Sequence, residues 1–385
     1  MWRELLPVGR DGTTGGYRRH AWTAADGECR AWFAEQAASR GLAYEVDRNG
    51  NQWAWLGDPA AGDAVVIGSH LDSVPDGGAY DGPLGVVSSF AALDALRERG
   101  VTPGRPLAVV NFGDEEGARF GVACVGSRLL TGVLDPEHAR GLRDGDGVLL
   151  ADAMERAGQD PAAIGRDDER LARIGAFVEL HVEQGRYLAD TPHPVGVASA
   201  IWPHGRWRFD FRGEANHAGT TRLGDRDDPM LAYAATVLSA RELARTAGAL
   251  ATFGKIRVEP NGTNAIASLV TAWLDSRAAD SATLDTLVKE IAGAAEGAEV
   301  TRESYTPVVD FDVPLRDRLS RVLGGVPVLP TGAGHDAGIL SSAVPTAMLF
   351  VRNPTGVSHS PYEYAEEPDC LAGIVALADV LQDLL

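Results

Sequence analysis

Cysteine is scarce in this chain, and long apolar runs are absent. Cys29, Cys124 and Cys370 are the only cysteines among 385 residues, and they lie far apart. This spacing provides neither a disulfide framework nor a Cys-x-x-Cys metal knuckle, so a reducing cytoplasm is the expected compartment. No apolar run is long enough to cross a bilayer, and the N-terminus lacks the apolar core of a secretory signal.

Basic residues are few relative to acidic ones. The sequence has 35 Lys and Arg against 54 Asp and Glu, which gives a formal charge of −19. Such a charge repels nucleic acid and anionic membrane surfaces, so neither is an expected partner. An anionic substrate would therefore need local attraction from metal ions or arginine. A G-x-G-x-x-G motif after a strand is also absent, which argues against dinucleotide binding.

The pattern that is present alternates apolar strands with amphipathic helices. Ala64–Gly68 and Leu107–Phe112 read as buried parallel strands, and Pro83–Arg99 between them has helical periodicity. A right-handed crossover in a sheet that is covered on both faces is the expected arrangement. Ala176–His181 reads as a further buried strand, and the α/β pattern resumes after Pro314.

The segment between these α/β parts has a different pattern. It reads as β-α-β-β-α-β, which is typical of an α+β sandwich with two helices on an antiparallel sheet. Two domains also suit the length of the chain. We therefore predict an α/β fold with a catalytic domain of residues 1–205 and 314–385, and an inserted domain of residues 206–313.

Histidine and carboxylate residues gather near the ends of the predicted strands: His70, Asp72, Asp81, Glu115, Glu116, His181 and His359. Sites in open α/β sheets form at the carboxyl ends of the strands. Histidine and carboxylate ligands without cysteine suit zinc, manganese or cobalt, and this many ligands can hold two ions. Glu115 and Glu116 point in opposite directions on an extended chain, so one can face the metals while the other accepts a proton.

Six motifs resemble the amidase/hydantoinase–carbamoylase branch of the di-metal aminoacylase and carboxypeptidase clan: GSHLDSVPDGGAYDGPLGV, FGDEEGARFG, ELHVEQG, ANHAGTT, GAGHDA and GVSHSPYEY. The branch includes allantoate amidohydrolases, N-carbamoyl-L-amino-acid hydrolases and β-ureidopropionases. The motifs occur in the family order between Gly16 and Glu367. The resemblance implies a di-metal exopeptidase-like catalytic domain with an inserted lid or dimerisation domain.

The resemblance also implies two divalent metal ions per subunit, Zn or Mn. The implied ligands are His70, Asp81 and His181 for one ion, and Asp81, Glu116 and His359 for the other, with Asp81 bridging. Glu115 would be the general base, and Asp72 would orient the ring of His70.

Four residues resemble the substrate-binding set of the family. By resemblance, His217 enters the active site of the partner subunit in a homodimer and stabilises the oxyanion. Asn264 and Arg277 resemble a substrate clamp, and Gln184 resembles a residue that binds the ureido group. The residues alone leave alternatives open, because His217 could cap a strand and Arg277 could form a strand-end salt bridge.

Other positions have two readings or depart from the family pattern. His335 and Asp336 either support the metal ligands or cap the helix that follows them. Arg226 and Asp228 match a family pair that is either structural or functional. Arg222 stands where the family usually has proline, and AIAS follows Asn264 where a Pro-Gly pair is common.

Two details favour an amidohydrolase over a peptidase. Asp81 follows His70 by 11 positions (81 − 70), and His181 stands where the peptidases of the clan carry a carboxylate. We expect hydrolysis of the ureido C–N bond of a small ureido acid, with allantoate ahead of N-carbamoyl-L-amino acids. β-Ureidopropionase, di-metal aminoacylase or dipeptidase, and non-catalytic metal-dependent binding protein are the alternatives, and Glu115 beside a full ligand set argues against the last.

Overall fold

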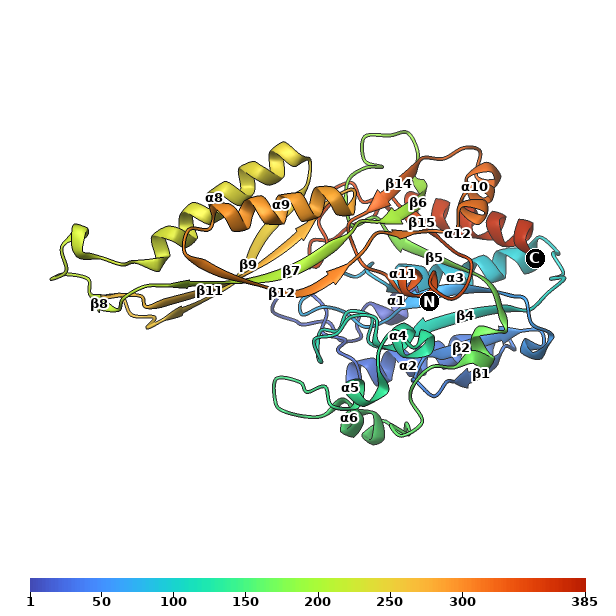
Figure 1. The fold of residues 1–385 in the computed structure, drawn as a ribbon. Helices are drawn as coiled ribbons and strands as arrows, with labels where there is room; N and C mark the ends of the chain where they lie inside the picture. Colours follow the sequence, from blue (N-terminus) through green and yellow to red (C-terminus); the bar gives the residue numbers. More distant parts are fainter. The chain divides into compact units, whose positions relative to one another are not determined.

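The computed structural model describes residues 1–385, which form two compact units (Figure 1). Unit 1 comprises residues 1–199 and 310–385, and unit 2 is the intervening segment 200–309. The assignment of a catalytic role to one unit and a lid or dimerisation role to the other stays a prediction. No helix combines the length and the apolar character needed to cross a membrane.

Unit 1 is built on a nine-stranded mixed sheet in the order β1-β2-β4-β3-β5-β15-β6-β13, with β14 beside β6. Its strands are β1 (Ala43–Val46), β2 (Gln52–Leu56), β3 (Ala64–His70), β4 (Leu107–Phe112), β5 (Ile174–Val182), β6 (Val195–Ile201), β13 (Val309–Asp310), β14 (Val328–Thr331) and β15 (Thr346–Val351). The four neighbours β4, β3, β5 and β15 run parallel, and β2 and β6 join them antiparallel. Every residue of β3, β4 and β15 is buried, as expected for parallel strands covered on both faces. The predicted α/β class is confirmed.

The helices of unit 1 cover this sheet. They are α1 (Trp2–Leu5), α2 (Ala24–Ser39), η1 (Pro59–Ala61), α3 (Pro83–Glu98), α4 (Val125–Thr131), α5 (Pro136–Arg140), α6 (Leu150–Arg156), α7 (Asp168–Leu171), α10 (Val313–Val322), α11 (Asp336–Leu340) and α12 (Glu367–Leu384). The main core joins α2, α3 and α12 through Phe33, Phe90 and Leu377. A separate apolar cluster joins α4, α5 and α6 through Leu129, Ala139 and Met154.

Helix α2 begins with a reciprocal cap. The Thr23 hydroxyl accepts the backbone N–H of Asp26, and the Asp26 carboxylate accepts the N–H of Trp22 at 2.8 Å. Asp26 is buried, and this burial raises the pKa of its carboxyl to about 6, although Arg30 and the Trp22 N–H oppose the shift. The carboxyl is therefore easier to bury with its proton than without it.

We expect the free energy of unfolding to fall as pH rises through this pKa, and Asp26→Asn to remove that fall. Between pH 3.8 and about 6 the folded chain keeps a proton that the unfolded chain has lost, so rising pH destabilises the fold by about 3 kcal/mol. Asparagine keeps an acceptor for the Trp22 N–H and does not titrate. Urea unfolding between about pH 4.5 and 7.5 should show a stability advantage of the variant that grows with pH. A constant difference would contradict the prediction.

Unit 2 is a two-layer α+β sandwich. Its elements are β7 (His204–Arg212), β8 (Asn216–His217), η2 (Leu223–Asp225), α8 (Pro229–Ala247), β9 (Leu250–Glu259), β10 (Ala265–Ile266), β11 (Leu269–Arg277), α9 (Ser281–Ala294) and β12 (Ala298–Thr306). The main sheet is antiparallel in the order β12-β7-β11-β9, and β8 pairs with β10. Phe209 and Val270 of the sheet share a core with Ala240 of α8 and Leu287 of α9. The predicted β-α-β-β-α-β order is confirmed, apart from the two additional short strands β8 and β10.

Candidate active site

The carboxyl ends of three neighbouring parallel strands carry polar side chains in unit 1. His70 ends β3, Glu115 and Glu116 follow β4, and His181 lies near the end of β5. Asp81 comes from the turn that leads into α3. The His70 ring lies against Gly82, where a Cβ atom would overlap the ring and where the backbone φ is +82°. Glycine is therefore needed for this close approach.

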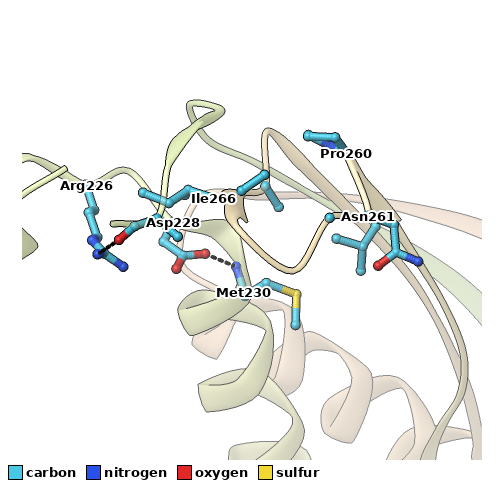
Figure 2. A pocket seen from close by; sticks show the side chains of 11 residues that line it. Arg226, Asp228, Met230, Pro260, Asn261 and Ile266 are labelled. Atoms are coloured by element: carbon cyan, nitrogen blue, oxygen red, sulfur yellow. Dashed lines mark hydrogen bonds between the residues drawn. The ribbon is translucent and has the colours of Figure 1, made fainter. Parts of the chain in front are cut away.

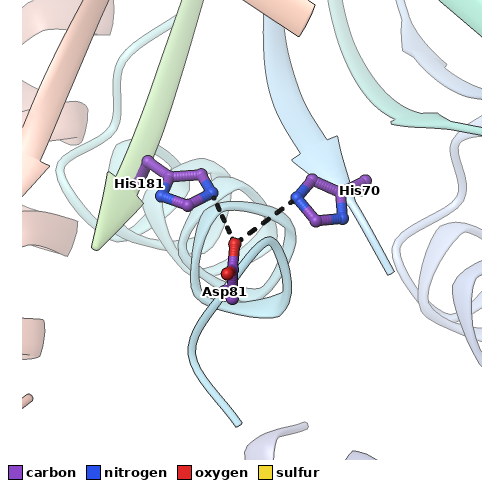
Figure 3. A group of neighbouring side chains, drawn as sticks. All are labelled: His70, Asp81 and His181. Carbon is purple, nitrogen blue, oxygen red and sulfur yellow. Dashed lines mark ion pairs between the residues drawn. The ribbon is translucent and has the colours of Figure 1, made fainter. Parts of the chain in front are cut away.

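His70, Asp81 and His181 form one group of buried side chains (Figure 3). The Oδ1 atom of Asp81 lies 3.3 Å from Nε2 of His181 and 3.8 Å from Nε2 of His70. Burial favours a neutral Asp81 carboxyl, but the imidazoles of His181 and His70, when they are protonated, outweigh it and lower the pKa of Asp81 below the ordinary value. The two rings come from different strands and turn toward one carboxylate oxygen.

The hydrogen bonds of the two rings leave their Nε2 atoms free to bind a cation. Nδ1 of His181 lies 2.9 Å from the Val182 carbonyl oxygen, and Nδ1 of His70 lies 3.2 Å from that of Asp72. A carbonyl oxygen only accepts, so in the neutral rings each Nε2 presents a lone pair toward Asp81, another acceptor. The Nε2 atom of His181 is buried and has no hydrogen-bond partner.

The spacing of these acceptors also fits a metal ion. The separations of 3.3 and 3.8 Å are longer than normal hydrogen bonds. They resemble the distance of about 3.4 Å that separates two ligands of one tetrahedral ion with bonds of about 2.1 Å. His70, Asp81 and His181 therefore fit a divalent cation.

Asp81, Glu116 and His359 form a second group that shares Asp81 with the first. Nε2 of His359 lies 3.5 Å from Oδ2 of Asp81 and 3.7 Å from Oε2 of Glu116. Each oxygen of Asp81 thus faces a different group, which is the arrangement of a bridging carboxylate. All five predicted ligands come together in unit 1, from both parts of its sequence.

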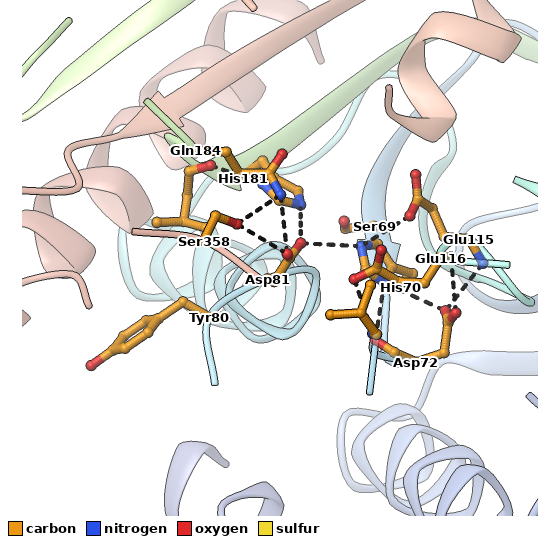
Figure 4. A network of polar contacts seen from close by, with 12 residues as sticks. Ser69, His70, Asp72, Tyr80, Asp81, Glu115, Glu116, His181, Gln184 and Ser358 are labelled. Carbon is orange, nitrogen blue, oxygen red and sulfur yellow. Dashed lines mark hydrogen bonds and ion pairs between the residues drawn. The ribbon is translucent and has the colours of Figure 1, made fainter. Parts of the chain in front are cut away.

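Glu115 lies beside these groups and belongs to neither. Its Oε2 atom is 3.7 Å from Nε2 of His70, and its Oε1 atom accepts the thiol hydrogen of Cys124 at 3.2 Å. The Asp72 carboxylate accepts the backbone N–H groups of Glu115 and Glu116 at 3.2 and 3.0 Å (Figure 4). Asp72 thus fixes the backbone of both glutamates, and its Oδ1 atom also lies 3.4 Å from Nδ1 of His70.

Burial and charge favour a basic Glu115. Burial is the largest cause that raises the pKa of the Glu115 carboxyl well above its ordinary value. His70 opposes this shift, whereas Asp336 and Glu116 add to it. A carboxyl with a raised pKa holds a proton more strongly than an exposed glutamate does, which is a feature of groups that transfer protons.

Gln184 contacts the shared carboxylate. Its Nε2 atom donates to Oδ2 of Asp81 at 3.0 Å and to Oγ of Ser358 at 3.1 Å (Figure 4). Its Oε1 atom is buried without a hydrogen-bond partner. The amide therefore has one acceptor available beside the candidate metal ligands.

The structure decides between the two readings of His335 and Asp336. The side chain of His335 makes no cap hydrogen bond at the start of α11, and the Glu179 carboxylate accepts the Ala337 N–H at 2.9 Å. The capping interpretation is therefore wrong. The His335 ring instead packs edge-on against the His181 ring with centroids 4.5 Å apart. Burial and the nearby His181 lower the pKa of His335 well below its ordinary value, so the ring is neutral.

His217 and Asn264 lie together in unit 2. His217 pairs with Ala265 across β8 and β10, and the Ala218 N–H donates to the Asn264 carbonyl oxygen at 2.9 Å. His217 is exposed, and its Nδ1 atom accepts the Gly219 N–H at 3.1 Å. In the neutral ring Nε2 therefore carries the proton and can donate it to a ligand.

Arg277 lies at the opposite end of unit 2 from these residues. Strand β11 starts at Leu269, shortly after β10, which pairs with β8, and it ends at Arg277. Its eight steps (277 − 269) span about 26 Å at 3.3 Å per residue. Within one chain, Asn264 and Arg277 are therefore too far apart along the strand to contact one small molecule together. The Arg277 guanidinium faces Asp275 at 2.8 Å, as the salt-bridge alternative predicted.

Arg226 and Asp228 have structural roles beside a cavity of about 240 Å³ in unit 2 (Figure 2). Arg226 donates to the carbonyl oxygens of Ala218 and Thr221 and so fixes the turn after His217. Asp228 accepts the Met230 N–H and caps α8. These hydrogen bonds support the structural reading of the pair.

Four residues at the site escaped the sequence reasoning: Cys124, Glu179, Ser358 and Glu363. Ser358 and Glu363 belong to the motif GVSHSPYEY, so their closeness to His359 in the sequence could have indicated them. Glu179 lies within an apolar strand, two residues before His181. Cys124 lies nine positions after Glu115, and the folded turn between them brings its thiol to the carboxylate.

Comparison with known proteins agrees with this geometry. Residues 66–383 match peptidase family M20/M25/M40. N-carbamoyl-L-amino acid amidohydrolase of Geobacillus stearothermophilus is 37% identical over 397 residues, covering 98% of this chain and 96% of that protein. Allantoate amidohydrolase of Escherichia coli is 32% identical over 391 residues, covering 96% and 93%.

A solved structure shows the same fold. A Burkholderia multivorans amidase of the hydantoinase/carbamoylase family has a TM-score of 0.86 and 29% identity, covering 100% of this chain and 96% of that one. The M20 family is metal-dependent, which suits the two ligand groups around Asp81. This chain therefore belongs to peptidase family M20/M25/M40, in its hydantoinase/carbamoylase branch, and is a hydrolase of C–N bonds.

Proposed function

We propose that this protein hydrolyses the ureido C–N bond of a small ureido acid, with allantoate as the preferred substrate. The observation that carries the proposal is the pair of ligand groups that share Asp81, with Glu115 beside them and outside both. A protein that only binds metal has no use for a buried carboxylate kept free of the ligand groups. The arrangement instead suits hydrolysis by an activated water.

The two groups would hold two divalent cations, Zn or Mn. His70, Asp81 and His181 would hold one cation, and Asp81, Glu116 and His359 the other. When bound, the cations would lower the pKa of water and polarise the ureido carbonyl. They would also attract an anionic substrate to a chain with a formal charge of −19.

Glu115 would perform the proton transfers. Its carboxylate takes a proton from the attacking water as the new C–O bond forms at the ureido carbon. The C–N bond then breaks, and Glu115 returns the proton to the departing nitrogen, which leaves as ammonia. The remaining carbamate loses carbon dioxide, leaving ureidoglycine from allantoate or an amino acid from a carbamoyl amino acid. The unpartnered Oε1 atom of Gln184 would accept an N–H of the ureido group.

We further propose that the active form is a homodimer with composite sites. His217 and Asn264 are about 26 Å or more from Arg277 along the strands of unit 2, so residues from both ends can meet one substrate only if they come from different subunits. His217 would stabilise the oxyanion through its Nε2 proton, and Arg277 would bind the substrate carboxylate with its planar fork.

An apolar face of unit 2 supports the same assembly. Leu231 and Leu238 of α8 are exposed, as are Leu250 and Ile256 of β9. β9 is an edge strand of the four-stranded sheet, and an exposed apolar edge is open to pairing with another chain. A second copy of this chain is the occupant that the composite site requires.

The three cysteines are free, which suits the expected reducing cytoplasm.

N-carbamoyl-L-amino acids are the second candidate substrates. The observation in their favour is the relative named for that activity, which is 37% identical to this chain. Both substrate types offer a ureido group beside a carboxylate, so the candidate residues can serve either. Arg222 departs from the family pattern near this region, and it is exposed with Asp225 3.5 Å away.

A substrate panel tests the function. Ammonia release should be measured with allantoate, N-carbamoyl-L-amino acids and N-carbamoyl-β-alanine, each with Zn and with Mn. An N-acetyl amino acid and a dipeptide test the aminoacylase and dipeptidase alternatives. We expect the highest kcat/KM with allantoate. Turnover of a carbamoyl amino acid without turnover of allantoate would replace the preferred substrate, and cleavage of the dipeptide alone would contradict the proposed reaction.

A further inference from the structure

The loop that carries His359 is tied to the turn that carries Asp81 by one buried carboxylate. Glu363 is 5% exposed. Its Oε1 atom accepts the backbone N–H groups of Tyr80 and Asp81 at 3.1 and 2.9 Å. Its Oε2 atom accepts the hydroxyl of Ser358 at 3.0 Å. One side chain therefore contacts two of the three polypeptide segments that supply the second ligand group, those of Asp81 and His359.

The chain makes room for this carboxylate. A Cβ atom on Gly78 would overlap the Glu363 side chain, so glycine is required for the turn to pass this closely. The rings of Tyr80 and Tyr364 meet edge to face with centroids 6.3 Å apart and pack the neighbouring surface. The Glu363 carboxylate thus occupies a fitted position rather than a solvent-facing one.

Ser358 extends this connection to the shared ligand. Its hydroxyl oxygen lies 3.0 Å from Glu363 and 3.5 Å from Oδ2 of Asp81. A hydroxyl has one proton, and the shorter contact indicates that Glu363 accepts it. The same hydroxyl oxygen accepts a hydrogen bond from the amide N–H of Gln184, with Nε2 at 3.1 Å. The same amide also donates to Oδ2 of Asp81 at 3.0 Å, so Ser358 and Gln184 connect Glu363 to the shared carboxylate.

We propose that Glu363 is a positioning residue that fixes the Asp81 carboxylate between the two ligand groups and sets the His359 loop beside it. The inference rests on the proposed two-cation function. Groups that orient metal ligands by hydrogen bonds commonly change metal affinity when removed. Because Glu363 holds the backbone of Asp81 through an acceptor oxygen, glutamine can replace it and alanine cannot.

Metal binding tests the inference without reference to any substrate. Zn²⁺ and Mn²⁺ are titrated by calorimetry into the full-length metal-free protein. We expect Glu363→Ala to weaken binding of one of the two cations by about 10–100-fold, and Glu363→Gln to stay within a few-fold of the wild type. Glu366→Ala is the matched control, because Glu366 is exposed near the same loop and its side chain makes no cap bond.

The outcomes separate this inference from the proposed function. Wild-type affinity for both cations in Glu363→Ala would overturn the positioning role, as would equal losses in the alanine and glutamine variants. Failure of the wild type to bind two cations would overturn the proposed function itself. Circular dichroism checks folding, and if Glu363→Ala does not fold, Ser358→Ala provides the loss variant. We expect that variant to weaken the same cation by a smaller factor, and unchanged affinity would count against the inference.

Discussion

Glu115→Gln should lower kcat by about 10²–10⁴-fold while the metal content of the protein stays unchanged. Glutamine is nearly isosteric, and its amide oxygen can still accept the Cys124 thiol that now contacts Oε1. It has no carboxylate to take a proton from water. Because Glu115 lies outside both ligand groups, the substitution should leave the five candidate ligands in place.

Steady-state kinetics on the best substrate of the panel and elemental analysis of the purified variant provide the measurement. Glu98→Gln is the matched control, since Glu98 is exposed at the end of α3 and should keep wild-type kcat. A kcat within tenfold of the wild type would remove Glu115 as the general base. Loss of activity together with loss of metal would instead identify Glu115 as a ligand.

A heterodimer of two inactive chains should recover about half of the wild-type activity. One chain carries Glu115→Gln and the other His217→Ala, and each homodimer alone should lose about 10²-fold or more. If His217 acts in the site of the partner, one of the two sites in the heterodimer contains neither substitution. Differently tagged chains, co-expressed and purified through both tags, give the heterodimer for a direct rate measurement.

The geometry of unit 2 supplies the control for this experiment. His217 and Asn264 lie at the same tip, so a heterodimer of His217→Ala and Asn264→Ala should stay inactive. His217 and Arg277 lie at opposite ends of β11, so their alanine variants should complement each other. Absence of recovery in a verified Glu115→Gln and His217→Ala heterodimer would show that His217 does not act across subunits.

Much of the fold follows from local sequence pattern. The apolar run Leu107–Phe112 has the bounds of β4, and the apolar run Ala64–Gly68 lies within β3. Both are central strands, where burial on both faces forces a continuous apolar stretch. Peripheral strands were less visible in the sequence. Gln52–Leu56 and Val195–Ile201 have antiparallel neighbours, and their residue types do not mark a strand clearly.

The members of the candidate metal site were predictable, because the resemblance implied five ligands that are among the seven polar residues expected near strand ends. The contacts that hold those ligands in place were not predictable. Glu363 lies 282 positions from the Asp81 N–H that it accepts, and no local pattern encodes such a pairing. The resemblance pairs Asn264 with Arg277 as a clamp, and an extended strand turns their short separation in sequence into a long distance within one chain.

The order of elements along the chain also has a consequence for synthesis. Unit 2 is one uninterrupted segment, whereas unit 1 needs residues from both sides of it. β15, which lies between β5 and β6, begins only at Thr346, and His359 follows still later. A chain leaving the ribosome can therefore complete unit 2 while unit 1 still lacks a strand from inside its sheet. A product terminated before Thr346 would expose the edges of β5 and β6 and would hold no complete second ligand group.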